Sequence, residues 1–377
     1  MRRHDVAVIG AGLAGLHCAR LLAERGLSVV LIDRKTSVTG PIHTTGIFVR
    51  KTWEDFALPA EQLGSGIRDV LLYSPRGKSL HLTAARDEFR LGRMNWIHTW
   101  LLDACSRAGV RWLPSAELLS CTPGPPIELS LAHCRHRESL TADYVVGADG
   151  PRSLVARMFG LDRNREFLVG LEEIVPHDGK PALHCYLDPL LAPGYIAWVI
   201  ADRGEAHIGV AGYRHRFDPA RALTAFRRKV GLAAAPVLER RGGLIPVNGI
   251  LRRIASERAL LTGDAAGAVS PLTAGGIDGA LRLSAYAASV IARAAERSEG
   301  IRQYDGGQFQ ARFAARRWMR RALNAVQRYP SLTEAAFTML RIPPLSSFAN
   351  HVFFSRGSFP DPAPARSGSQ SAVAAAQ

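Results

Sequence analysis

The hydrophobic pattern at the start of the chain alternates between the strand and helix periods. An apolar, β-branched run at 6–9 predicts a buried strand. Apolar residues then recur at helical spacing over 13–25, and Gly26 is a natural place for that helix to stop. A second apolar run, 27–32, predicts another strand that ends at Asp33. The order strand, helix, strand indicates a βαβ unit.

The rest of the chain mixes helical and strand patterns instead of dividing into two consecutive blocks. Helical spacing occurs at 95–108, 219–230 and 275–295, and strand patterns occur at 70–73, 79–82, 110–113, 117–120, 127–132, 142–146, 182–187, 195–200, 207–210, 244–247 and 260–262. This alternation predicts an α/β protein whose domains are interleaved along the sequence.

A glycine motif, GAGLAG, lies between the first strand and the first helix. Gly10 is expected to make the tight turn, and Gly12 lets backbone N–H groups approach a pyrophosphate. Gly15 lets the helix pack closely on the strands. Asp33 follows about 20 residues later, where a carboxylate accepts hydrogen bonds from ribose hydroxyls. The complete context favours a dinucleotide site over an ordinary glycine-rich turn.

Two further motifs of glycine and aspartate also follow predicted strands. GADGPRS places Asp149 at a strand end, although a simple turn with a helix N-cap would look the same. GDAAGAVSPLTAGGI places Asp264 where it can accept from a ribitol hydroxyl, and Gly276 and Ile277 open a long helix. The positive end of that helix would stabilise charge on a reduced flavin ring. The three motifs together predict one FAD bound from three directions.

Composition narrows the remaining classes. The five cysteines are scattered and never spaced as CxxC, which favours reduced thiols in the cytoplasm over disulfides or a metal site. No apolar run reaches 18 residues, so no membrane span is predicted. The formal net charge is +15, but the arginines are dispersed and no nucleic-acid-binding module is recognisable. We therefore expect no nucleic-acid partner.

The order of the motifs resembles the p-hydroxybenzoate hydroxylase-type FAD-dependent oxidoreductase superfamily. The GxGxxG motif is followed by Arg93 at a helix start, then by the DG and GD motifs. Within this superfamily the chain most resembles the geranylgeranyl reductase family, because GDAAG is followed by Pro271 and then Gly-Gly-Ile. Aromatic hydroxylases usually carry histidine after GDAA and asparagine after the later glycines. The stretches PGY…WV from Pro193 and GGLIPV at 242–247 also resemble the reductases, and the likeness covers roughly residues 5–300.

The resemblance implies a Rossmann-type FAD-binding domain interleaved with a mixed-sheet substrate domain, plus a C-terminal helical region. The expected boundaries are 1–40, 90–160 and 255–300 for the FAD-binding domain, 41–89 and 161–254 for the substrate domain, 301–358 for the helical region and 359–377 for a disordered tail. The FAD contacts that it implies are Gly10, Gly12, Gly15, Asp33, Arg93, Asp149, Asp264, Gly276 and Ile277.

The implied activity is reduction of C=C bonds in a hydrophobic, isoprenoid-like substrate, by hydride transfer from reduced flavin. NAD(P)H or ferredoxin would be the electron donor. The chain departs from the family in two places. Several members carry a cysteine in the loop where this chain reads His43-Thr44-Thr45-Gly46, and the family's aromatic strand usually ends in a proline where this chain has Ile200-Ala201. A flavin-dependent monooxygenase and a non-catalytic flavin-binding scaffold are the two alternatives.

Three side chains are candidates for the substrate site. Tyr195 and Trp198 lie on a predicted strand and would line an apolar tunnel, the alternative being that they are ordinary core aromatics. His43 is the candidate proton donor, the alternative being a surface histidine.

The C-terminal region combines arginines with apolar residues. Its arginines include Arg312, Arg316, Arg317, Arg320, Arg321 and Arg328, and the apolar residues Phe337, Met339, Leu340, Phe348, Phe353 and Phe354 follow. Two interpretations remain open. A basic amphipathic helix could lie on an anionic membrane and receive a lipid substrate, or it could cover the FAD domain with solvated arginines. We expect a cytoplasmic protein, membrane-associated under the first interpretation.

Overall fold

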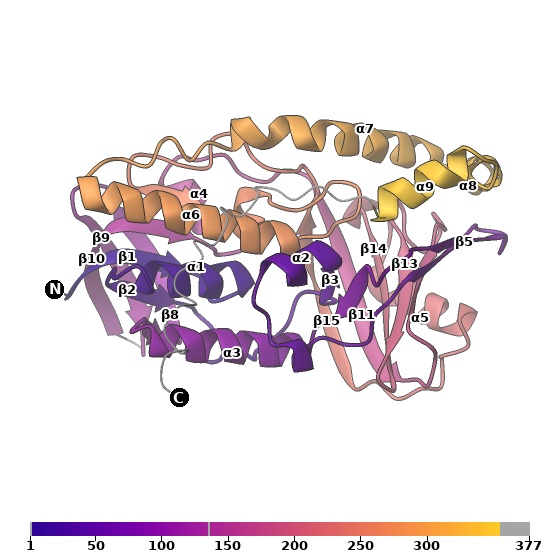
Figure 1. Cartoon of the computed structure of the whole chain (residues 1–377), viewed down its shortest axis with the longest axis horizontal. Coiled ribbons are helices and arrows are strands. Elements are labelled where there is room, and N and C mark those ends of the chain that lie inside the picture. Colours follow the sequence, from indigo (N-terminus) through magenta and orange to yellow (C-terminus); the bar gives the residue numbers. More distant parts are fainter. Residues whose placement is uncertain (1, 135, 355–377) are drawn as a thin grey trace, which may run out of the picture.

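Two large β-sheets lie side by side along the long axis of the molecule in the computed structural model, which describes residues 2–134 and 136–354 (Figure 1). The α/β fold predicted from the sequence is confirmed: a Rossmann-type FAD-binding half, a mixed-sheet half and C-terminal helices. The exact domain boundaries stay a prediction. The predicted tail, 359–377, lies outside the described residues, as does 355–358.

The first sheet has the strand order β7-β2-β1-β10-β9-β8, with β16 beside β10. Its strands are β1 (Arg2–Ile9), β2 (Val29–Ile32), β7 (Arg111–Leu113), β8 (Ala116–Thr122), β9 (Ile127–His133), β10 (His136–Gly147) and β16 (Ala259–Leu261). β1, β2, β7, β10 and β16 run parallel, whereas β8 and β9 form an antiparallel extension. All four residues of β2 are buried, as expected for parallel strands covered on both faces.

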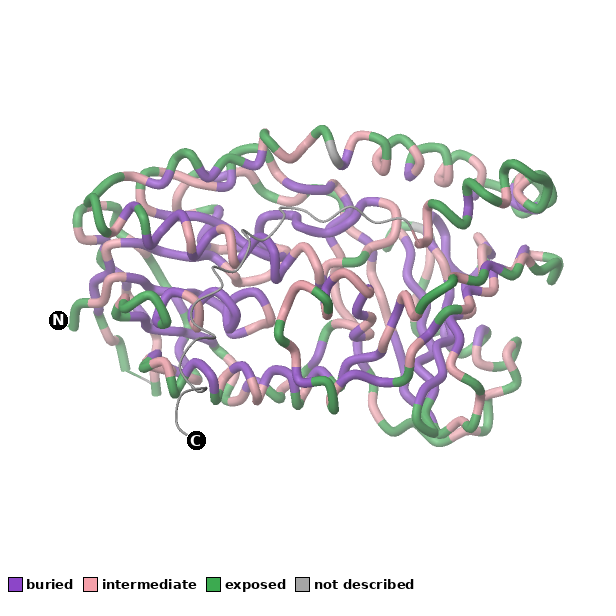
Figure 2. The backbone as a smooth tube through the Cα atoms, viewed as in Figure 1, coloured by how far each residue is buried: buried purple, intermediate pink, exposed green. Residues whose placement is uncertain are grey.

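Three helices pack beside this sheet: α1 (Leu13–Ala23), α3 (Met94–Arg107) and α6 (Ile277–Arg297). α1 contacts both α3 and α6. Figure 2 shows the purple, buried stretches gathered in the two sheets and along α1 and α6.

The second sheet has the order β15-β11-β14-β13-β12-β4-β5. Its strands are β4 (Asp69–Tyr73), β5 (Ser79–Thr83), β11 (Phe167–Pro176), β12 (Ala182–Tyr186), β13 (Ala197–Asp202), β14 (Glu205–Gly212) and β15 (Glu239–Pro246). α5 (Pro219–Lys229) contacts β11 and β14 and so covers one face. Glu173 points to that face, where Arg227 donates to it at 2.8 Å. Glu172, its neighbour in the strand, therefore points to the opposite face.

Shorter elements connect these layers. A two-stranded sheet joins β3 (Ile47–Val49) to β6 (Phe89–Leu91). The helix α2 (Arg50–Asp55) follows β3, and α4 (Leu154–Met158) follows β10. Short 3-10 turns occur at Ala60–Gln62, Arg214–Arg216, Gly263–Ala266 and Gly306–Phe309.

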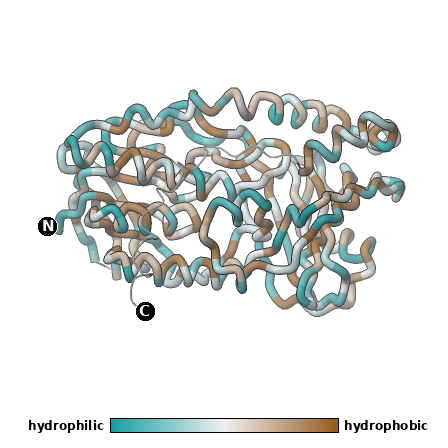
Figure 3. Tube along the Cα trace, in the orientation of Figure 1, coloured by the Kyte–Doolittle hydropathy of each residue, from teal (hydrophilic) through white to brown (hydrophobic). Residues whose placement is uncertain are grey.

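The C-terminal region consists of α7 (Gln310–Val326), α8 (Pro330–Leu340) and α9 (Leu345–Phe354). α7 runs along one long side of the molecule, and α8 and α9 lie near the second sheet (Figure 1). Hydrophilic and hydrophobic stretches alternate along α7 (Figure 3). Within the described part of the chain, no helix has both the length and the apolar character needed to cross a membrane.

The arginines of α7 are not all solvated, which corrects one of the two interpretations of this helix. Arg320 is only 3% exposed, and its guanidinium stacks over the rings of Tyr195 and Tyr213. Arg316 donates to Ser270 Oγ at 3.1 Å. These contacts fasten α7 to both halves of the molecule.

Candidate functional site

The three motifs meet because the strands that precede them are neighbours in register. Ile9 at the end of β1 pairs with Gly147 at the end of β10, and Gly147 pairs with Leu261 at the end of β16. The strands are parallel, so their carboxyl ends form one edge of the sheet. Ligands of open α/β sheets bind in the crevice at that edge.

The glycines of the first motif occupy three different environments. Gly10 has φ +104°, and a Cβ there would lie 2.3 Å from the carbonyl oxygen of Ala148. A Cβ on Gly15 would lie 1.8 Å from the carbonyl oxygen of Gly10. A Cβ on Gly12 would meet nothing within 4 Å, and Gly12 lines the large cavity described below. The backbone at Gly12 is thus open to a ligand at the start of α1.

Asp33 is buried beside this motif. Its Oδ2 accepts from the N–H of Ala11 at 2.6 Å and its Oδ1 from that of Lys35 at 2.8 Å. The carboxylate therefore joins the glycine loop to the end of β2. Arg93 lies elsewhere: it is the N-cap residue of α3, its side chain is exposed, and it does not line the cavity.

Asp149 has two differently used carboxylate oxygens. Oδ2 accepts from the N–H groups of Leu154 at 2.6 Å and Val155 at 3.1 Å, so Asp149 does cap the turn into α4. Oδ1 is buried and has no partner among the described residues. Burial raises the pKa of this carboxyl despite the hydrogen bonds that it accepts. The orphaned oxygen is suited to a ligand hydroxyl.

Asp264 is a second carboxyl of the cavity wall whose pKa is raised. Burial raises its pKa to about 6, and within the described residues no donor reaches its carboxylate. Its backbone carbonyl is held by Asn164 Nδ2 at 2.8 Å. Gly276 is the N-cap of α6 and Ile277 its first residue, and no side chain caps that end. Unpartnered acceptors and free helix N–H groups are what the ribitol and ring of FAD require, so these residues fit the cofactor.

One cavity of about 1170 Å³ extends from these loops to the second sheet and the C-terminal helices. The loop side contributes Gly12, Asp149, Asp264, Gly276 and Ile277. The far side is apolar, and its side chains include Phe89, Leu183, Phe313, Phe337, Leu340 and Phe353. The helices α7, α8 and α9 thus form part of the cavity wall, a role that the sequence pattern did not indicate.

The three substrate-site candidates all line this cavity. Tyr195 donates from its hydroxyl to the carbonyl of Thr273 at 2.5 Å. Trp198 donates from Nε1 to Glu172 Oε2 at 3.1 Å. His43 is exposed and its Nδ1 donates to the carbonyl of Gly242 at 2.6 Å.

A buried polar cluster on the second sheet was missed by the sequence analysis. Glu172 is 4% exposed and contacts His207, Thr45 and Trp198. The available signal was the pair Glu172-Glu173 inside an otherwise apolar strand. The partners lie far away in the sequence, so the cluster itself could not be inferred.

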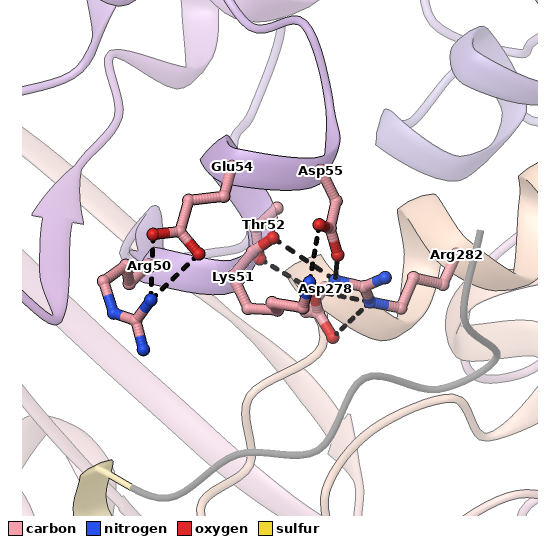
Figure 4. A network of polar contacts seen from close by, with 7 residues as sticks. All are labelled: Arg50, Lys51, Thr52, Glu54, Asp55, Asp278 and Arg282. Carbon is pink, nitrogen blue, oxygen red and sulfur yellow. Dashed lines mark hydrogen bonds and ion pairs between the residues drawn. The ribbon is translucent and has the colours of Figure 1, made fainter. Parts of the chain in front are cut away.

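A second polar network ties α2 to the start of α6 (Figure 4). The fully buried side chain of Arg282 pairs with Asp55 at 2.6 Å and with Asp278 at 2.9 Å. Thr52 donates to Asp278 at 2.8 Å. Lys51 completes the group by pairing with Asp55 at 2.7 Å. The network fixes the first turn of α6 against the segment that follows the His43 loop.

Comparisons with known proteins agree with this geometry. Residues 5–128 match the family described as FAD dependent oxidoreductase, and residues 218–355 match the family described as lycopene cyclase protein. The digeranylgeranylglycerophospholipid reductase of Methanothrix thermoacetophila is 28% identical over 323 residues, which cover 80% of this chain and 82% of that protein. The chloroplastic geranylgeranyl diphosphate reductase of Oryza sativa is 26% identical over 340 residues, covering 84% and 73%.

A solved structure extends the likeness to the fold. The crystal structure of a geranylgeranyl bacteriochlorophyll reductase-like protein from Thermoplasma acidophilum superposes with a TM-score of 0.77 at 20% identity. The match covers 93% of this chain and 100% of that one.

Proposed function

This chain is an FAD-dependent oxidoreductase of the geranylgeranyl reductase type, and we propose that it reduces carbon–carbon double bonds in a hydrophobic, isoprenoid-like substrate. The observation that carries the proposal is the cavity. One side of it is made of loops that fit FAD, and the other of aromatic and aliphatic side chains that fit an apolar chain.

The roles of the loop residues follow from their environments. The open backbone at Gly12 and the start of α1 receive the pyrophosphate, while Gly10 and Gly15 keep the turn tight enough for that approach. The Asp33 carboxylate would accept hydrogen bonds from the ribose hydroxyls. Asp149 and Asp264 would accept from hydroxyl groups of the cofactor, and the N–H groups at Gly276 and Ile277 would stabilise negative charge on a bound flavin ring. Arg93 is exposed at the start of α3 and does not line the cavity, so its expected contact with FAD stays a prediction.

FAD, when bound and reduced, supplies hydride to the substrate. The protein must orient the alkene, exclude water and provide a proton. The apolar side chains of the cavity wall, among them Phe89 and Phe353, perform the first two tasks. They give the cavity the shape of the substrate and offer no hydrogen bonds to water. Tyr195 and Trp198 belong to this wall. His43 stays a candidate proton donor, with one ring nitrogen occupied by Gly242.

Anaerobic reoxidation of the reduced protein is the direct test. The FAD-loaded protein is reduced with dithionite and mixed with geranylgeranyl diphosphate, and the return of the oxidised flavin absorbance is followed. We expect reoxidation together with a product heavier by two hydrogens for each bond reduced. A reduced flavin that reacts only with oxygen, with formation of an oxygenated product, would replace the proposal with a monooxygenase. NAD(P)H and reduced ferredoxin are then compared as donors by the rate at which each reduces the flavin.

We also propose that the outer surface of α7–α9 contacts an anionic membrane and receives a lipid substrate there. This surface exposes large apolar side chains, among them Trp318 at 68% exposure, Met339, Ile342 and Phe348. Two exposed cations lie close by, Arg321 on α7 and Arg341 directly after α8.

Truncation is unsuitable as a test of membrane contact because α7–α9 also enclose the cavity. Two outward substitutions, Trp318→Glu and Met339→Glu, leave the cavity wall intact. We expect them to reduce sedimentation with phosphatidylserine vesicles and to leave the FAD content unchanged. Equal sedimentation of the double variant and the original chain would reject membrane contact by this surface.

A further inference from the structure

We propose that Arg316 and Arg320 on α7 form a site for a phosphate headgroup, and that this site anchors one end of the isoprenoid chain in the cavity. The proposal rests on the proposed alkene reduction. It adds that the substrate carries a phosphate, either as a prenyl diphosphate or as a phosphorylated glycerol lipid.

Arg316 is the charged member of an otherwise uncharged part of the wall. Among the described residues that α7–α9 contribute to the cavity, it is the single charged one, and Phe313, Met319 and Leu323 beside it are apolar. Its Nη1 donates to Ser270 Oγ at 3.1 Å, which holds the guanidinium against the loop that precedes α6. A guanidinium carries several N–H donors in a planar fork, so it can hold Ser270 and a phosphate together.

Arg320 lies one helical turn further along α7 and is buried behind the wall. It is 3% exposed, and its Cζ lies 5.6 and 5.3 Å from the ring centroids of Tyr195 and Tyr213. Arg320 itself does not line the cavity, whereas Tyr195 does. Nη1 and Nη2 are buried and have no hydrogen-bond partner among the described residues. The rings offset part of the positive charge, but the terminal N–H groups stay unsatisfied.

Both arginines are tied to the same turn of the cavity wall. Arg316 bonds Ser270 directly. Arg320 stacks on Tyr195, whose hydroxyl donates to the carbonyl of Thr273 at 2.5 Å. Two cations of α7 therefore lie close to the segment 270–273, at the end of the cavity where the helix meets the loop before α6.

A purely structural role explains this pair of cations less well. Two positive charges one turn apart on a helix repel each other, and a buried charge is costly unless a counter-charge accompanies it. The buried Arg282 has such partners, because Asp55 and Asp278 both pair with it. The terminal nitrogens of Arg320 have no carboxylate partner among the described residues. An anion in the adjacent cavity would supply the negative charge.

The two arginines would act on a bound phosphate in different ways. Arg316 lines the cavity, so its N–H groups would donate directly to phosphate oxygens. Arg320 would act from behind the wall through its charge, because water screens a buried charge only weakly. Arg316 is therefore the binding residue, and Arg320 strengthens the positive potential at the same place.

This placement orients the chain in the cavity. The headgroup lies between α7 and the segment 270–273, and the isoprenoid tail extends over the apolar side chains of the wall, such as Leu183, Phe337 and Phe353. A neutral isoprenoid alcohol would contact the same side chains but would lack the anchor. The site therefore predicts a preference for phosphorylated substrates over alcohols with the same chain.

The test compares two substrates that differ only in the headgroup. FAD-loaded protein is reduced with dithionite, and its anaerobic reoxidation by geranylgeranyl diphosphate and by geranylgeraniol is followed. The readout is the ratio of the two apparent second-order rate constants, because a general loss of structure lowers both constants and leaves their ratio. We expect the original chain to prefer the diphosphate by at least about tenfold.

Substitutions on α7 assign this preference to the two arginines. Arg316→Met should reduce the ratio about tenfold, the effect of losing one hydrogen bond to a charged group. Arg320→Met should reduce it by a smaller factor, because Arg320 acts through its charge alone. Arg317→Met is the matched control and should keep the original ratio. Arg317 is next to Arg316, does not line the cavity, and donates to the carbonyl of Gln310 at 3.3 Å.

A second measurement needs no turnover. Inorganic pyrophosphate should raise the thermal unfolding midpoint of the oxidised, FAD-loaded original chain and of Arg317→Met, relative to sodium chloride at the same ionic strength, since a ligand of the folded state stabilises it. The increase should be lost in Arg316→Met and reduced in Arg320→Met. FAD content is measured in all four proteins. Loss of FAD from Arg316→Met would place this residue at the cofactor and overturn the headgroup site.

A second pair of substrates distinguishes the two carriers of the phosphate. Digeranylgeranylglycerophosphate and digeranylgeranylglycerol are compared in the same way. A preference that depends on Arg316 in this pair identifies the glycerol lipid as the substrate, and one confined to the prenyl pair identifies the diphosphate. Either result supports the site.

The outcomes separate the two proposals. If none of these alkenes reoxidises the reduced flavin of the original chain, the proposed function fails and the headgroup site fails with it. If they do, but phosphorylated substrates are not preferred or Arg316→Met keeps the preference, the headgroup site alone is wrong. Equal stabilisation of all four proteins by pyrophosphate would overturn the site as well.

Discussion

The two sheets offer opposite chemistry to the cavity that they share. The first sheet presents backbone N–H groups and carboxylates at the ends of parallel strands, with Gly12, Asp149 and Asp264 among them. The second sheet and the helices α7–α9 present aromatic and aliphatic side chains, interrupted by the cluster around Glu172. A dinucleotide needs many directed hydrogen bonds, whereas an apolar chain needs a shaped, dry wall.

This difference predicts how each half of the molecule responds to substitutions. On the cofactor side the backbone must approach the cofactor closely, so a single added methyl group can abolish FAD binding. On the substrate side, binding depends on many packing contacts added together, so most single substitutions should alter substrate specificity more than the stability of the fold. Substitutions that change one half and leave the other intact therefore test this contrast.

The largest effect is expected at Arg282, where α2 is tied to the start of α6 (Figure 4). Arg282→Met removes a fully buried guanidinium that pairs with Asp55 and Asp278, and we expect the free energy of unfolding to fall by about 3 kcal/mol. Arg50→Met is the matched control: Arg50 pairs with Glu54 and Glu88, but its side chain is 29% exposed, so its loss should cost only about 1 kcal/mol. Urea unfolding measures both.

The same substitution should have a pH signature. Burial raises the pKa of Asp55, but hydrogen bonds from Lys51 and Arg282 outweigh it and the pKa lies below the ordinary value. The stability from this pairing is therefore present above the unfolded-state pKa of about 4 and is lost as the pH falls below it. The difference in the free energy of unfolding between the original chain and Arg282→Met should therefore become smaller at acidic pH. A gap that is constant or widens would contradict the assigned ion pair.

The next largest effect is expected at the glycine motif. Gly15→Ala puts a methyl group 1.8 Å from the carbonyl oxygen of Gly10, and we expect a loss of about 2 kcal/mol together with lost FAD. Gly12→Ala meets nothing within 4 Å, so its stability should change by less than about 0.5 kcal/mol while FAD binding weakens. Equal destabilisation by the two changes would show that Gly12 is not open to a ligand.

A smaller change in the free energy of unfolding, of opposite sign, is expected when Asp264 is replaced. Its pKa is raised to about 6 by burial, so in the FAD-free protein its ionisation lowers stability as the pH rises from about 4 through 6. Asp264→Ala should therefore stabilise the FAD-free protein at pH near 7.5 by about 1 kcal/mol, with no gain near pH 4. It should also lower the FAD retained after gel filtration. Undiminished FAD would remove Asp264 from the cofactor site.

The cofactor half was largely predictable because its information is local. Each motif lies within a few residues of a strand end, and parallel strands bring such ends to one edge of a sheet. The prediction that FAD is the cofactor is confirmed. The residue roles stay proposals, and four of the proposed contacts, Gly10, Gly15, Asp33 and Arg93, do not line the cavity.

The substrate half was predictable only in part. Trp198 lies on β13, as predicted, whereas Tyr195 lies before that strand and not on it. Thr45 and Glu172 are 127 positions apart in the sequence and meet only through the tertiary fold. The C-terminal helices posed a different problem. α8 is apolar on more than one side, with Phe337 turned toward the cavity and Met339 turned to solvent, so hydrophobic spacing alone could not assign its inner face.

Blocking the cavity from its helical side tests most directly whether the second sheet and α7–α9 hold the alkene. Ala349 on α9 is buried in the cavity wall, and Ser347 lies on the exposed side of the same helix. We predict that Ala349→Trp keeps its FAD but, once reduced, is reoxidised by geranylgeranyl diphosphate more than about tenfold more slowly than Ser347→Trp, since about 1.4 kcal/mol of lost binding is tenfold. Equal reoxidation rates for the two variants would contradict the placement of the substrate.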